Sequence, residues 1–157
     1  MMARLHFTLA LIAFFAVAPE LTVADSMGTT AAVSRAAARP EFRSYGLYLD
    51  THDAGLGAWQ VEVVDLAAKS RLVGIEGGEH RAFAQPAFYD PKALQGARIV
   101  LAAFAPDDEL PRGKTRVATL HLRVDADAPP EFKLRLIAAV DALGNDIDAE
   151  LEIRQES

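Results

Sequence analysis

The stretch GAWQVEVVD, Gly57 to Asp65, sets the fold of this 157-residue chain. Trp59, Val61 and Val63 lie on one side of an extended backbone, and the residues between them lie on the other. This period of two residues predicts a strand with one buried face. Because one strand cannot bury a face alone, we expect two sheets packed over Trp59.

Segments of similar character predict the remaining strands: Ser44 to Thr51, Arg71 to Ile75, Arg98 to Phe104, Arg116 to Val124, Phe132 to Val140 and Ile147 to Ile153. No strong helical period occurs between them. We therefore predict an all-β protein, a two-sheet antiparallel β-sandwich of Greek-key or jelly-roll type with about seven to nine strands.

Several of these segments also predict which side chains face the core. Arg98 to Phe104 is apolar on both faces, which is typical of a central strand. In the predicted strand Arg116 to Val124, Val117 is expected to face outward. The residues expected to face inward in this strand and in Phe132 to Val140 are Ala118, Leu120, Leu122, Val124, Phe132, Leu134, Leu136, Ala138 and Val140.

The N-terminal region has the layout of an export signal. Met1 to Arg4 is basic, Leu5 to Ala18 is apolar, and Thr22 to Ala24 offers small residues for cleavage. We predict a signal peptide at 1–24, a flexible leader at 25–43, the sandwich domain at 44–153 and a tail at 154–157. The protein is then secreted or periplasmic, with no stable membrane span after cleavage; an uncleaved anchor is the alternative.

Composition excludes several kinds of chemistry. A formal net charge of -6 and the lack of any Lys/Arg run argue against a nucleic-acid partner. The chain contains no cysteine, so disulfides, thiolate metal sites and a cysteine nucleophile are excluded.

No catalytic or metal constellation emerges from the motifs. Glu79 and His80, with Glu76 nearby, form a polar loop without a second histidine at ligand spacing. Asp141 to Asp148 lacks the alternating acids of a calcium loop. No G-x-S-x-G occurs. We therefore expect no enzyme activity, no cofactor and no metal, with a small hydrolase as the third reading.

The segment Glu79 to Gln95 is a long irregular connection that carries aromatic residues. Phe83, Phe88 and Tyr89 either close the open end of the sandwich or form a platform for a sugar ring. The glycines that precede it, Gly77 and Gly78, are expected to adopt a positive φ.

A weakly basic stripe is the candidate site for a protein partner. Thr119, His121 and Arg123 point outward from one predicted strand, and Lys133 and Arg135 from the next. If these strands share a sheet, the side chains form one surface suited to an interface. The alternative is ordinary protection of a sheet edge.

The order of the segments resembles that of cohesin-like domains. The pieces are LGAWQVEV (Leu56 to Val63), LVGIEGG (Leu72 to Gly78), IVLAAF (Ile99 to Phe104), GKTRVATLHLRV (Gly113 to Val124) and DALGNDI (Asp141 to Ile147). The resemblance implies a nine-stranded sandwich of the carbohydrate-binding-domain-like type without enzyme activity. It also implies a dockerin-like partner, bound through one sheet face, in polysaccharide metabolism.

Together these features predict a non-catalytic exported module that binds another extracytoplasmic protein in a scaffold or adaptor role. The alternative is a carbohydrate-binding module that uses Phe83, Phe88 and Tyr89.

Overall fold

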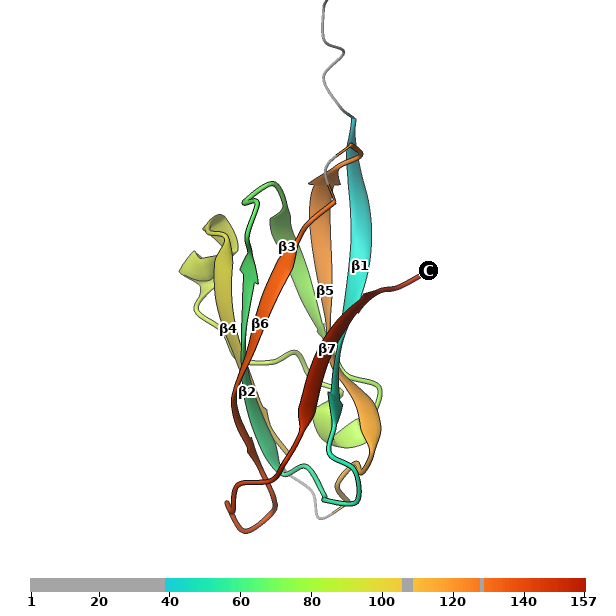
Figure 1. The fold of residues 1–157 in the computed structure, drawn as a ribbon, viewed down its shortest axis with the longest axis vertical. Helices are drawn as coiled ribbons and strands as arrows, with labels where there is room; N and C mark the ends of the chain where they lie inside the picture. Colours follow the sequence, from blue (N-terminus) through green and yellow to red (C-terminus); the bar gives the residue numbers. More distant parts are fainter. Residues whose placement is uncertain (1–38, 106–108, 128) are drawn as a thin grey trace, which may run out of the picture. The chain divides into compact units, whose positions relative to one another are not determined.

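The strand built around Trp59 lies at the centre of one of two sheets in the computed structural model of this protein (Figure 1). The structure describes residues 39–105, 109–127 and 129–157. Within them, the chain forms β1 (Pro40–Asp50), β2 (Ala58–Asp65), β3 (Arg71–Gly77), η1 (Arg81–Phe83), η2 (Pro91–Gln95), β4 (Arg98–Phe104), β5 (Lys114–Asp125), β6 (Phe132–Val140) and β7 (Glu150–Gln155). Both η elements are short 3-10 helices.

Two antiparallel sheets face each other, as Figure 1 shows. One has the strand order β3-β5-β1-β7 and the other the order β4-β2-β6. The predicted all-β, two-sheet antiparallel sandwich is therefore confirmed, with seven strands in the described part of the chain.

The core between the sheets is built from the predicted alternation. Trp59, Val61 and Val63 are buried on β2, and Tyr45 and Leu47 are buried on β1. Since Trp59 is only 2% exposed, it is a core residue and no ligand platform. The inward faces of the two sheets bury these side chains together.

Two β-bulges overturn part of the predicted alternation. The register between β1 and β5 shifts at Leu47, so Val117 is buried next to Ala118 instead of facing outward. A second shift, between β2 and β6, places Ala139 in the core. The prediction of Ala138 as inward was therefore wrong, and so was that of Val140. One extra residue in a strand reverses the facing of every residue beyond it.

Strand β4 lies at an edge, so the prediction that it is central was wrong. Its outer edge is partly covered, because Phe88 and Ala102 form an isolated antiparallel bridge. The outward face of β4 carries Val100, Ala102 and Phe104, and of these Phe104 is 62% exposed.

The Gly77-Gly78 pair does not adopt a positive φ, contrary to the prediction. Its glycines are required by close backbone approach. A Cβ on Gly77 would lie 2.1 Å from the carbonyl oxygen of Ala84, and one on Gly78 would lie 2.2 Å from that of Arg116. Both distances are below any real Cβ contact, so side chains are excluded here.

The strands extend beyond the predicted domain limits at both ends. Strand β1 begins at Pro40, inside the predicted leader, because β5 continues to Asp125 and offers pairing partners there. Strand β7 runs to Gln155, into the predicted tail. The predicted signal peptide, 1–24, lies outside the described residues. Among the described residues, no helix has the length and apolar character needed to cross a membrane.

Candidate functional site

The predicted basic stripe does not exist as one surface. Strand β5 belongs to the four-stranded sheet and β6 to the three-stranded sheet, so their outward side chains lie on opposite sides of the sandwich. Thr119, moreover, is 6% exposed and lies between Gly46 and Glu76 of the neighbouring strands. Arg123 remains exposed on β5, and Lys133 and Arg135 remain exposed on β6.

His121 makes contacts that no sequence motif indicated. Its Nδ1 lies 2.9 Å from Ser44 Oγ on β1, and its Nε2 lies 3.1 Å from Glu76 Oε1 on β3. A serine, a histidine and an acid are thus brought together from three strands. They lie on the outer face of a sheet, and none of the hollows described below is lined by Ser44 or His121. These contacts link β1, β5 and β3 across the outer face of the four-stranded sheet.

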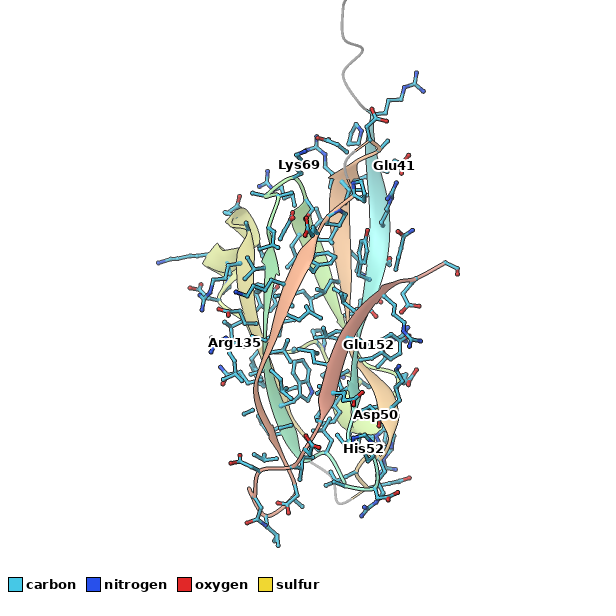
Figure 2. All side chains as sticks on the ribbon, viewed as in Figure 1. Glu41, Asp50, His52, Lys69, Arg135 and Glu152 are labelled. Carbon is cyan, nitrogen blue, oxygen red and sulfur yellow. The ribbon has the colours of Figure 1, made fainter. Side chains whose placement is uncertain are left out.

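Around β7, this outer face is polar and its side chains pair with one another. Tyr48 Oη donates to Glu156 Oε1 at 2.9 Å, and Lys114 Nζ lies 2.8 Å from Glu152 Oε1. Figure 2 labels Glu152 on β7, on the side of the four-stranded sheet. Side chains that satisfy one another in this way leave little unmet bonding capacity for a partner.

The outer face of the β4-β2-β6 sheet is divided into a charged half and an apolar half. We call it the three-stranded face. Its outward residues follow from the strand register. The charged half contains Val64, Glu62, Arg98, Val100, Lys133 and Arg135. The apolar half contains Ala58, Gln60, Ala102, Phe104, Ala138 and Val140, with Phe88 beside them.

In the charged half, Glu62 is held between two arginines. Arg135 Nε donates to Glu62 Oε2 at 2.9 Å, and Arg98 Nε donates to Glu62 Oε1. The hydrogen bonds from Arg135 and Arg98 lower the pKa of the Glu62 carboxyl below its ordinary value. With Lys133 beside them, three cations surround one fixed anion, and this half is net positive. Figure 2 labels Arg135 at this sheet.

In the apolar half, two phenylalanine rings are stacked in the open. The rings of Phe88 and Phe104 have centroids 5.8 Å apart and planes inclined by 6°. They are 67% and 62% exposed, respectively. Phe88 is fixed by two backbone hydrogen bonds with Ala102, of 2.7 and 3.0 Å.

The stacked rings separate two hollows. One, of about 290 Å³, lies over the sheet and is lined by Gln60, Ala138 and Val140 as well as the rings. The other, of about 240 Å³, lies toward the loop and is lined by Pro86 and Gln85 as well as the rings. A surface with an aromatic ridge between two hollows fits apolar side chains of a partner.

The three predicted loop aromatics have different surroundings. Phe83 is 2% exposed and packs edge-on against Trp59, with ring centroids 6.3 Å apart. Tyr89 is half-buried against the core. Phe83 and Tyr89 therefore close the sandwich, which was one of the two alternatives predicted from the sequence. The three aromatic residues do not form one platform. Only Phe88 is exposed, and its companion Phe104 was missed, although the apolar outward side of β4 was the available signal.

The acidic and histidine residues of the loops stabilise turns. His80 Nδ1 accepts from the Ala82 amide at 3.2 Å, and Glu79 Oε1 accepts from the Arg116 amide at 3.0 Å. Asp141 Oδ1 accepts from the Leu143 amide at 2.8 Å. Over residues 39–105, 109–127 and 129–157, no group of three or more His, Cys, Asp or Glu side chains is placed to hold a metal ion.

Comparison with known proteins finds no relative: no family model, no curated protein and no solved structure matches this chain. The resemblance to cohesin-like domains stays a prediction from the order of the sequence segments.

Proposed function

We propose that this chain is a non-catalytic, exported binding module that holds a partner protein on the three-stranded face. The observation that carries the proposal is the exposed, stacked Phe88–Phe104 pair between two hollows. Exposed aromatic residues at a protein surface are typical of the centre of an interface.

Burial of these rings would contribute part of the free energy of recognition. At 67% and 62% exposure, the two rings offer about 250 Å² of aromatic surface, if each Phe side chain has about 200 Å² in all. At about 25 cal/mol per Å², this area corresponds to a gross gain of about 6 kcal/mol before the costs of association. The hollows on either side increase the area that a partner can cover.

Charge determines what kind of partner fits. Arg98, Lys133 and Arg135 outnumber Glu62 in the charged half of the face, whereas the whole chain carries a net charge of -6. A partner that presents apolar side chains beside acidic ones would complement both halves. A cohesin-like role in a scaffold, with a dockerin-like partner, is one specific form of this proposal.

The test is a capture experiment with surface variants of this protein. The purified protein is incubated with native envelope and secreted extract, of which one half has been treated with protease. The face variant combines Phe88→Ser and Phe104→Ser. The matched control is Leu143→Ser, because Leu143 is 86% exposed, lies in the turn after β6 and lines neither hollow beside the rings.

We expect one protein to bind the unaltered chain and the Leu143→Ser control, and to be lost with the face variant. Equal capture by all three proteins would rule out the three-stranded face. Retention of carbohydrate from both halves of the extract would instead favour a glycan-binding module.

A further inference from the structure

A second feature lies on the opposite side of the sandwich, on the outer face of the four-stranded sheet. Here Arg71 of β3, Arg123 of β5 and Phe42 of β1 are direct cross-strand neighbours. Like charges that face each other across neighbouring strands are destabilising. Two adjacent arginines without an acid between them therefore constitute an unbalanced charge.

The neighbouring side chains do not neutralise the two arginines. Arg71 Nη2 donates to Gln95 Oε1 at 2.6 Å, but this partner is neutral. The Arg123 side chain makes no hydrogen bond or ion pair with another described residue. A polar hollow next to the pair is lined by Lys69 and Asp125, so the local charge from three cations and one anion is net positive.

An apolar hollow lies on the other side of the arginines. It measures about 410 Å³ and is lined by both arginines together with Phe42, Val73 and Leu94. The register shift between β3 and β5 falls at Val73, whose side chain is 48% exposed. The site thus joins two guanidinium groups to an apolar wall in a space of ligand size.

We propose that this Arg71–Arg123 site binds the carboxyl-terminal end of a peptide whose last residue is apolar. The terminal carboxylate lies on the guanidinium groups, which bind its two oxygens in a planar, bidentate manner. The apolar last side chain packs in the hollow against Phe42 and Val73. This ligand would supply both the missing negative charge and the apolar contact. The site is separate from the three-stranded face and does not depend on it.

A matched pair of peptides tests the proposal without any change in the protein. The probes are acetyl-Ala-Ala-Leu with a free carboxylate and the same peptide with a carboxamide end, titrated into isotope-labelled protein and followed by amide NMR shifts. We expect saturable binding of the acid, with shifts concentrated around Arg123 on β5. The amide should bind at least about tenfold more weakly, because charge-assisted hydrogen bonds are lost.

Variants of the protein then locate the site. Arg123→Gln and Arg71→Gln should each weaken binding of the acid at least about tenfold, and Phe42→Ser should weaken it several-fold. The combined Phe88→Ser and Phe104→Ser variant should leave it unchanged, since those rings lie in the other sheet.

The proposal is overturned if the acid shows no saturable binding or if the amide binds equally well. It is also overturned if both arginine variants bind the acid as the unaltered chain does. Thermal melts check that the variants are folded. Loss of peptide binding with intact capture by the three-stranded face, or the reverse, separates this proposal from the proposed function.

Discussion

Phe83 and Phe88 belong to the same loop between β3 and β4, yet their replacement by alanine should have very different effects. Phe83 is 2% exposed and contacts Trp59, whereas Phe88 is 67% exposed and stacks on Phe104. We predict that Phe83→Ala strongly destabilises the domain and that Phe88→Ala does so only mildly.

The magnitudes follow from burial. Truncating a buried Phe costs about 3–5 kcal/mol, because apolar contacts are lost and a cavity is left. Only about a third of the Phe88 surface, about 65 Å², is buried, so Phe88→Ala loses at most about 1.6 kcal/mol of unfolding free energy at 25 cal/mol per Å². The free energy of unfolding should therefore fall at least about twice as far for Phe83→Ala as for Phe88→Ala.

Urea unfolding measures both changes. Far-UV circular dichroism is the main probe, because Trp59 is the only tryptophan and Phe83→Ala alters its native surroundings directly. An unchanged dependence on urea would show that the same cooperative unit unfolds in each variant. If Phe88→Ala costs as much free energy as Phe83→Ala, the exposed ridge is part of the core and the proposed interface is wrong.

Two other changes test the loops. Gly78→Ala should lower the free energy of unfolding by at least about 2 kcal/mol, because the new Cβ would lie 2.2 Å from the Arg116 carbonyl oxygen. The control Gly96→Ala should be nearly neutral, because no atom lies closer than 3.7 Å to its Cβ position. Equal effects of the two variants in chemical unfolding would contradict this prediction. Asp65→Asn should cost about 1–3 kcal/mol at neutral pH, because the carboxylate accepts from the Ser70 amide and hydroxyl at 2.8 and 2.7 Å. Burial raises the pKa of the Asp65 carboxyl, but the hydrogen bonds lower it by more, so the folded pKa lies below the ordinary value. The carboxylate therefore stabilises the fold fully above the unfolded pKa near 3.9, and this stabilisation is lost as the pH falls through the folded pKa. Unfolding at several pH values should thus show the two proteins converge below about pH 4, and a constant difference would refute the role of the charge.

The two outer faces of the sandwich differ in how well their side chains are satisfied. Around β7 the four-stranded sheet is covered by mutual polar contacts, such as that between Lys114 and Glu152. The three-stranded face instead carries an exposed aromatic pair. This contrast is why we assign the proposed protein interface to the three-stranded face.

Local patterning alone determined the fold class. The alternation in β2 predicted that Trp59, Val61 and Val63 are buried, because the facing of a side chain on a regular strand depends only on its parity. Tyr45 and Leu47 on β1 are buried with the same period of two residues. Local patterning also predicted an all-β sandwich, since most apolar segments after residue 43 alternated with the period of a strand and no strong helical period competed with them.

Only the tertiary structure decided which faces carry which side chains. Val117 and Ala138 changed sides because bulges arise in the pairing with β1 and β2, strands that are distant in the sequence. The assignment of β5 and β6 to different sheets likewise separated His121 and Arg123 from Arg135. The bridge between Phe88 and Ala102 of β4 brought Phe88 against Phe104. Strand order and register depend on long-range pairing and packing, and no local pattern contains that information.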